Sequence, residues 1–428
     1  MNKAHRLALI LALGLAAAIS STPQSGWAHP AAPQAPILGP HIDIWLDDVP
    51  NFASQVAYNS RHDEYLVVWA NGKGATVDIQ ARRIRGDGTL LNDFIVVHNE
   101  SYRNYQPAAA YSPEQDEYLI AYTYENSSTG NDIWARRVAW DGSWTSGEIP
   151  IRTESGYQHD PAVAYNSQAD EYLVVYQNTW ASGLQDIAAQ RVRASDGGLL
   201  SWCNIATAPP TEPDERRSAP DVAYNFARNG YLITYTYRPS DSDPGDVYGK
   251  VTSGNMGELS EEIHICDTPV SQEYHAVAAG PDEYLVTWTN RFTSEAKDDI
   301  CARRVSGDGV PEGLAEGFPI AEGAAYQMLP AVAYGEGYGY LIAWRRIVGT
   351  PGGWHTQGRY VMPGHDWPVG EGFEVSDTES FDTGEDVACA PSGSCFVVMD
   401  NIFDGTDYDV QGRMVSPHRV YLPLVVHN

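Results

Sequence analysis

The chain has 428 residues, of which 43% are apolar and 11% aromatic, so it can form a large core and intrinsic disorder is excluded. It contains 27 Lys and Arg against 56 Asp and Glu, a formal net charge of −29. A surface this acidic repels phosphate backbones and anionic lipids, which makes nucleic acids and membrane surfaces poor partners.

Residues 1–28 have the pattern of a secretory signal peptide. Met1–Arg6 is basic, Leu7–Ile19 is apolar, and Gly26–Ala28 supplies small residues for cleavage. The apolar run is too short to span a bilayer, and the alternative is an uncleaved anchor helix. His29–Pro40 is rich in Pro and Ala and reads as an extended linker. We therefore expect a secreted, extracellular or cell-surface protein without a transmembrane span.

Four short elements recur seven times between residues 41 and 415. The first resembles Pro161-Ala-Val-Ala-Tyr165, the second Tyr65-Leu-Val-Val-Trp69, and the third Asp299-Ile-Cys-Ala-Arg-Arg-Val305. A turn such as Asp87-Gly88 follows, and then a weaker element such as Phe94-Ile-Val-Val97. Successive second elements begin 53 to 59 residues apart. Four strands at this period predict an all-β fold, a single seven-bladed β-propeller with four-stranded antiparallel blades.

The second element supports this interpretation because both of its faces are apolar. Tyr65, Val67 and Trp69 share one face of the strand, and Leu66 and Val68 share the other. A strand with one wet face would alternate with polar residues. These strands are therefore expected to be covered on both sides by neighbouring blades.

The two ends of the repeat predict how the ring closes. Ile42-Asp-Ile44 lies 53 residues before Ile95-Val-Val97 and aligns as a fourth strand without a blade before it. The seventh copy has three elements and then only the apolar tail, residues 416–428. We predict that the N-terminal strand completes the last blade and removes the free sheet edge. The alternative is the tail segment Val420–Val426, which Pro423 disfavours.

The five cysteines fit an oxidising compartment. Cys389 and Cys395 flank the loop of the seventh hairpin, which predicts a disulfide between them, with two buried free thiols as the alternative. Cys203, Cys266 and Cys301 leave an odd thiol, and their pairing stays open. No Cys or His cluster indicates zinc.

The repeat resembles that of secreted bacterial β-propellers of undefined function, over about residues 42–415. This resemblance implies the fold and, for activity, no more than a binding or surface protein. The sialidase Asp-box, the WD and kelch signatures and cofactor motifs are absent from the sequence.

An Asp and an Arg recur on one face of the third element. Two interpretations are open: a partly buried ion pair that fixes strand geometry, which repetition in most blades favours, or a ring of charged ligands. The pairs are Asp78 with Arg82, Asp132 with Arg136, Asp299 with Arg303, and Asp409 with Arg413.

Departures from the repeat give the candidate catalytic residues. The first position of the innermost strand is usually Pro, but it is His275 in copy five, Glu385 in copy seven and Ser54 in copy one. Tyr274 and His159 occupy comparable positions. A His and a carboxylate at the mouth of the central channel could perform acid–base chemistry. Drift in degenerate blades is the simpler explanation.

The expected loops between the second and third strands carry aromatic residues suited to stacking on sugars, with local packing as the alternative. These are Tyr124, Trp180, Tyr237, Phe292, Trp354 and Phe403. Two acidic loops, residues 241–246 and 404–409, are weak candidates for Ca²⁺, and solvated turns are favoured there.

We therefore expect a non-catalytic scaffold, monomeric, that binds a glycan or protein ligand on its loop face. The alternative is a carbohydrate-active enzyme, a polysaccharide lyase or glycoside hydrolase, with its site over the central channel. A purely structural envelope role is a third option. Propellers host many unrelated activities, so the fold does not choose among them.

Overall fold

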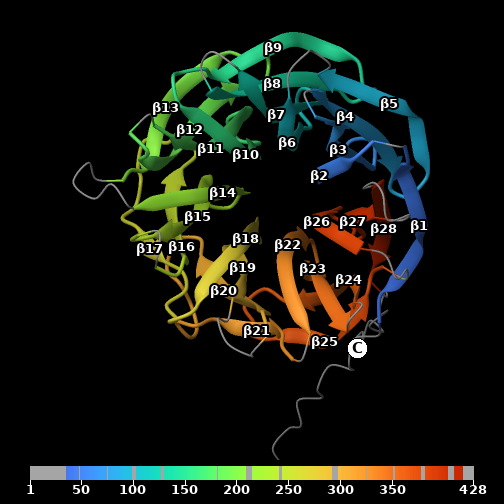
Figure 1. Cartoon of the computed structure of the whole chain (residues 1–428), viewed down its shortest axis with the longest axis vertical. Coiled ribbons are helices and arrows are strands. Elements are labelled where there is room, and N and C mark those ends of the chain that lie inside the picture. The colour runs from blue at the N-terminus through green and yellow to red at the C-terminus, as the bar shows by residue number, and fades with distance from the viewer. Residues whose placement is uncertain are drawn as a thin grey trace, which may run out of the picture. The chain divides into compact units, whose positions relative to one another are not determined.

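The computed structural model describes residues 35–47, 49–74, 76–98, 103–126, 130–180, 182–208, 215–240, 243–291, 297–323, 325–349, 352–376, 381–402 and 409–417. Within these residues 28 strands form seven four-stranded antiparallel sheets, and no helix is present that could cross a membrane. The predicted all-β, seven-bladed propeller is confirmed (Figure 1). The predicted signal peptide lies outside the described residues.

Each blade runs from an inner first strand to an outer fourth strand, and blades are numbered here in chain order. The first strands are β2 (Asn51–Asn59), β6 (Asn104–Ser112), β10 (Tyr157–Asn166), β14 (Arg216–Asn225), β18 (Ser271–Ala279), β22 (Tyr326–Gly335) and β26 (Phe381–Cys389). The second strands are β3 (Glu64–Lys73), β7 (Glu117–Asn126), β11 (Glu171–Thr179), β15 (Gly230–Arg238), β19 (Glu283–Arg291), β23 (Gly339–Gly349) and β27 (Cys395–Ile402).

The outer strands are less regular in length. The third strands are β4 (Thr76–Arg85), β8 (Gly130–Ala139), β12 (Gln185–Arg193), β16 (Asp246–Ser253), β20 (Asp299–Ser306), β24 (Gly352–Val361) and β28 (Asp409–Ser416). The fourth strands are β5 (Leu90–His98), β9 (Trp144–Arg152), β13 (Leu199–Ala206), β17 (Ile263–His264), β21 (Phe318–Ala321), β25 (Pro368–Glu374) and, in blade seven, β1 (Ile37–Trp45). The first strands surround the centre of the ring, and each contacts the first strands of both neighbouring blades (Figure 1).

The second strands form the core between blades, as their two apolar faces predict. Leu66 and Val68 of β3 pack into one cluster with Tyr118 and Ile120 of blade two. Tyr65, Val67 and Trp69, on the other face of β3, pack with Phe396 and Val398 of blade seven. Each fully buried large side chain contributes roughly 1.5–3 kcal/mol, so the interface between blades is the main source of stability.

The N-terminal strand closes the ring. Strand β1 pairs antiparallel with β28, and Gln411 Nε2 donates to Asp43 Oδ1 across the pair at 2.8 Å. Strand β1 begins at Ile37, inside the segment expected to be a linker. The fourth place in blade seven is therefore taken by β1, as predicted; the alternative segment Val420–Val426 lies outside the described residues.

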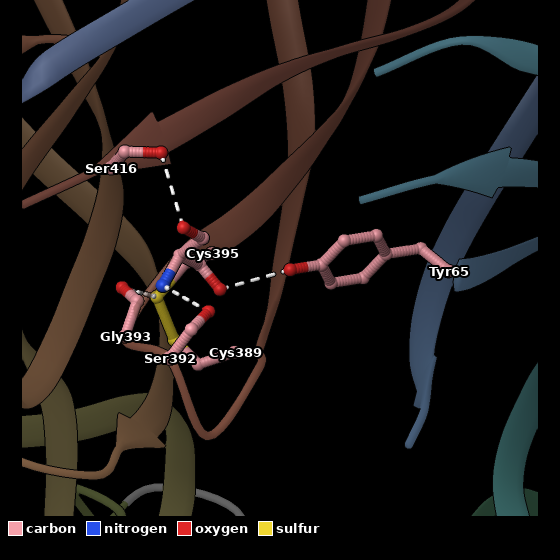
Figure 2. The surroundings of a disulfide bond; sticks show 7 residues. Tyr65, Cys389, Ser392, Gly393, Cys395 and Ser416 are labelled. Carbon is pink, nitrogen blue, oxygen red and sulfur yellow. Dashed lines mark hydrogen bonds between the residues drawn. A yellow bond between two sulfur atoms is a disulfide. The ribbon is translucent and has the colours of Figure 1, made fainter. Parts of the chain in front are cut away.

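The predicted disulfide between Cys389 and Cys395 is confirmed. It links the first and second strands of blade seven at their turn, where the two residues are directly paired (Figure 2). Tyr65 of blade one reaches the same turn and donates to the carbonyl oxygen of Ser394 at 2.9 Å (Figure 2). Cys203, Cys266 and Cys301 are free thiols.

The recurring arginine of the third strand joins neighbouring blades. The predicted ion pair between this arginine and the Asp on the same strand is wrong in blades one and five. Arg303 Nη1 donates to the carbonyl oxygen of Ile265, at the outer edge of blade four, at 2.8 Å. Arg82 donates in the same way to the carbonyl oxygen of Ile44. No ion pair between Asp78 and Arg82, or between Asp299 and Arg303, is found among the described residues. The next arginine along the strand pairs instead with a glutamate of the second strand, as Arg83 does with Glu64.

The antiparallel meander gives the ring two different faces. We call the face where the first strands begin, together with the loops between second and third strands, the first-strand face. The opposite face carries the turns between strands one and two and between strands three and four; we call it the hairpin face. The candidate catalytic residues and the described aromatic candidates belong to strands or loops at the first-strand face, whereas the disulfide lies at the hairpin face.

Candidate functional site

A β-bulge recurs in the first strand of every blade and shapes the mouth of the channel. The pairing of first and second strands shifts register at equivalent positions in blades one to six, for example between His159 and Ala162. In blade seven the shift comes slightly earlier, between Asp382 and Gly384. The bulged residue has a φ of 50–56° in six blades, although it is a bulky Tyr274 or Leu329 in two of them. Such residues are strained unless their surroundings hold them. Bulges re-aim side chains and are common beside functional sites.

His275 follows the bulge in blade five and is held as a neutral imidazole. Its Nδ1 lies 3.3 Å from Oγ1 of Thr236 in blade four. Burial lowers its pKa from 6.5 to about 4. A histidine in this state is not a proton donor at neutral pH, because its acid form is almost absent there.

The other acid–base candidates do not join His275 in one contact group. His159 belongs to blade three, where its Nδ1 lies 2.9 Å from Oδ2 of Asp160. Tyr274 is exposed at the bulge of blade five. Glu385 lies in β26 of blade seven, opposite Met399 in the pairing, and its side chain is outside what the structure describes. Among the described contacts, none connects His159 with His275 or with Tyr274.

Sequence reasoning missed three carboxyl groups close to the channel. Asp221 of blade four accepts hydrogen bonds from the backbone N–H of Val222 at 2.7 Å and of Val277, in blade five, at 2.9 Å. Asp386 of blade seven accepts from the N–H of Val56, in blade one, at 2.8 Å. Both occupy the second position of the first element, which is Ala in most copies. They therefore depart from the repeat just as His275 does at the first position.

The third carboxyl, Asp400 of β27, accepts from the N–H of Ser54 in blade one at 3.2 Å. These aspartates satisfy backbone donors on first strands, whose inner edge has no further strand to pair with. Burial raises the pKa of Asp221 and Asp400 from 3.8 to about 6. Burial, with a contribution from the negative charge of Asp221, raises the pKa of Asp386 to about 7.

The aromatic residues expected in loops are differently placed. Strands β7, β15 and β24 are longer than expected, so Tyr124, Tyr237 and Trp354 lie within strands. Trp180 lies in a loop, as expected, and its Nε1 donates to Oδ2 of Asp186 at 2.6 Å. Phe292 and Phe403 lie outside the described residues.

The described aromatic residues of this set all have local partners. The Tyr237 hydroxyl donates to Glu215 at 2.8 Å, and the guanidinium of Arg345 lies 4.7 Å from the ring centroid of Trp354. Tyr124 packs with its ring 5.8 Å from that of Trp134. Of the two acidic loops proposed for Ca²⁺, residues 241–242 and 404–408 lie outside the described residues. Within the described residues no cluster of three His, Cys, Asp or Glu suited to a metal occurs.

A different set of aromatic residues is exposed on the first-strand face. Tyr157 begins β10, Tyr326 begins β22, and Tyr274 sits at the bulge of β18. Their exposed fractions are 56%, 40% and 45%. Because equivalent strands of a propeller start at the same face, the three tyrosines lie on one face, in blades three, five and six. We call them the face tyrosines.

Comparison with solved structures places the chain in a fold class. It is similar to the polysaccharide lyase Uly1, with 10% sequence identity and a TM-score of 0.53, over 89% of this chain and 99% of that one. It is also similar to a protein of unknown function from Dyadobacter fermentans DSM 18053, with 9% identity and a TM-score of 0.50, over 90% of this chain and 99% of that one. At these identities the likeness shows the propeller fold alone.

No protein-family model matches this sequence, and no curated protein sequence is similar to it.

Proposed function

We propose that the chain is a secreted β-propeller that binds a glycan on its first-strand face without transforming it. The observation that carries this proposal is the set of face tyrosines. Large aromatic rings usually turn inward, and Tyr combines a flat apolar ring with a polar hydroxyl, which suits a ligand that has both apolar faces and hydroxyl groups. Tyr157 and Tyr326 begin their first strands and Tyr274 lies three residues into its own, so all three are on one face, which supports one shared ligand.

The chemistry of the channel supports binding rather than catalysis. His275 is neutral, and the buried carboxyl groups accept hydrogen bonds from the backbone of neighbouring blades. An acid and a base that act on one substrate must both reach it, and the candidates are distributed over blades three, five and seven. The polysaccharide lyase Uly1 illustrates that a propeller of similar fold can handle a carbohydrate.

The proposal is tested by screening the purified chain on a glycan array and measuring the affinity of each hit by calorimetry. Tyr274→Ala and Tyr326→Ala should each weaken binding about three- to tenfold, the range expected for the loss of one aromatic contact. Phe226→Ala and Trp367→Ala are matched controls, because both residues are exposed aromatics in turns of the hairpin face. Equal losses in all four variants, or no glycan bound at all, would contradict the proposal.

A carbohydrate-active enzyme is the second candidate, and the raised pKa of Asp386 favours it. A carboxyl group with a pKa near 7 can serve as either acid or base at neutral pH. Each array hit should therefore be incubated with the protein and checked for new reducing ends and unsaturated products. Products that disappear in Asp386→Asn or His275→Gln would replace the binding proposal with a catalytic one.

A further inference from the structure

Cationic side chains gather around two of the face tyrosines, although the chain as a whole is strongly acidic. Arg238 Nη2 and Arg291 Nη1 each contact Glu273, the residue before Tyr274, at 2.9 Å. Lys297 Nζ lies 3.9 Å from the ring centroid of Tyr326. Three cations thus lie within one sector of the first-strand face, in blades four and five.

These residues are linked through two acids that adjoin them in the chain. Tyr274 directly follows Glu273, which accepts from Arg291 Nη1. Arg291 Nε lies 3.7 Å from Asp298, the neighbour of Lys297 in the chain. The line therefore runs from Tyr274 through Arg291 and Lys297 to Tyr326, and we call these four residues the tyrosine–cation strip.

The strip retains capacity to bind an anion. Arg291 is exposed, and its contacts with Glu273 and Asp298 use Nη1 and Nε. A guanidinium has five N–H donors arranged for bidentate contact with carboxylates, so donors remain for a ligand. Arg238 and Arg291 share Glu273, and Arg291 also lies near Asp298, whereas Lys297 lies against the ring of Tyr326.

We propose that the glycan bound on the first-strand face is acidic, with uronate carboxylates that pair with Arg291 and Lys297 while its sugar rings lie against Tyr274 and Tyr326. This inference rests on the proposed function, because it names the ligand class of the same face. The pairing is specific in chemistry. A uronate glycan can place carboxylates at the two cations, which lie between the two rings, whereas a neutral sugar can use the rings alone.

The test compares ligands that differ only in the carboxylate. Hexasaccharides of galacturonate, glucuronate and mannuronate are titrated against the full chain beside galactose, glucose and mannose hexasaccharides of the same linkage. We expect at least one uronate hexamer to bind about fivefold or more tightly than its neutral counterpart, as charge-assisted hydrogen bonds would give. Arg291→Gln and Lys297→Gln should each reduce this ratio, and Tyr326→Ala should weaken both ligands together.

Arg228→Gln is the matched control, because Arg228 is an arginine of the hairpin face that also contacts two carboxylates, Asp282 and Asp308. It should leave the ratio unchanged, and the melting temperature of each variant establishes that it is folded. Neutral hexamers that bind as well as their uronate counterparts, or uronate hexamers that do not bind, would overturn this inference. Neutral glycans among the array hits would then still uphold the proposed function, whereas an array without hits would overturn both.

Discussion

Asp386 and Asp400 stand where the last blade meets the first. Both belong to blade seven and both accept hydrogen bonds from backbone N–H groups of blade one, those of Val56 and Ser54. Burial raises the pKa of both carboxyl groups. The folded chain therefore retains their protons over a pH range in which the unfolded chain has released them.

This difference predicts that stability falls as the pH rises. Between the ordinary pKa of 3.8 and the value of about 7 for folded Asp386, the folded state binds more protons than the unfolded state. One unit of pKa shift corresponds to about 1.4 kcal/mol, so the free energy of unfolding should fall by on the order of 2 kcal/mol between pH 5 and pH 8. Urea unfolding at a series of pH values measures this.

Asp386→Asn should flatten that dependence, since an amide retains an acceptor oxygen for Val56 N–H and does not titrate. The control is Asp308→Asn, at a position where 70% of the side chain is exposed. It should reproduce the pH dependence of the unchanged chain. An Asp386→Asn variant with the original pH profile would show that another group is responsible.

Arg136 represents the arginines that join blades, and its role could not be predicted from the sequence. The repeat placed it on one strand face with Asp132, whereas it donates to the carbonyl oxygen of Val97 in blade one. It also lies 3.3 Å from Glu148 and under the ring of Trp144, 3.9 Å from the centroid. Strand periodicity shows which residues share a face but not what the next blade presents to that face.

Arg136→Met should therefore lower the free energy of unfolding by about 1–2 kcal/mol, because the buried carbonyl oxygen of Val97 loses its donor. Glu148 retains contacts with His98 and Tyr122. Arg193→Met removes a more exposed partner of Asp196 and should cost clearly less than Arg136→Met. Denaturant unfolding of the two variants provides the comparison. Equal decreases in the free energy of unfolding would mean that the contacts of Arg136 between blades add no more stability than an exposed ion pair.

At the scale of strands, the repeat predicted the order and alternation of the elements well but not their ends or irregularities. The second and third strands extend further than their apolar cores, which turned Tyr124, Tyr237 and Trp354 from expected loop residues into strand residues. The bulge was also missed. The only sign of the bulge in the sequence is the residue after it, which is Pro in four blades. A Pro can end regular pairing, but it does not show in which direction the preceding side chain points.

The hairpin with the disulfide gives a prediction at this scale. Cys389 and Cys395 enclose a short loop, with a sequence separation of 6, so a chain-entropy argument assigns about 2 kcal/mol to the link. Changing both residues to Ala should lower the free energy of unfolding by about that amount. Reductant added to the unchanged chain should give the same loss, and a Cys301→Ala variant, which retains the disulfide, should still respond to reductant. No response in the unchanged chain would contradict the assignment.

For the whole molecule, the number of blades was predictable because each blade corresponds to one copy of the sequence repeat. The route of closure was predictable because the last blade needs a fourth strand to cover its outer edge. The site was less predictable. The candidates were chosen as departures from the repeat, and that signal identified Tyr274 and His275 but gave no measure of exposure, charge state or neighbours across blades. The face tyrosines Tyr157 and Tyr326 do not depart from any motif, so only the structure distinguishes them from buried tyrosines such as Tyr118.

Closure by β1 predicts the behaviour of a chain that begins at residue 47. Its seventh blade would expose the edge of β28, whose backbone groups β1 otherwise pairs. We expect a lower melting temperature and concentration-dependent self-association, measured by calorimetry and light scattering. A peptide of residues 35–46 added in trans should reverse both effects, and an unchanged melting temperature would refute the role of β1.

The pairing of β1 with β28 also imposes an order of events on the growing chain. Asp43 and Gln411 are 368 residues apart, so the strand that is made first must wait for nearly the last one before it finds its partner. Contacts this distant in sequence form slowly, because the intervening chain must be organised first. In a polypeptide that ends before β28, β1 would have no strand to pair with. Ring closure thus acts as a check of completeness, in which only a chain translated through its seventh blade reaches the closed and protease-resistant state.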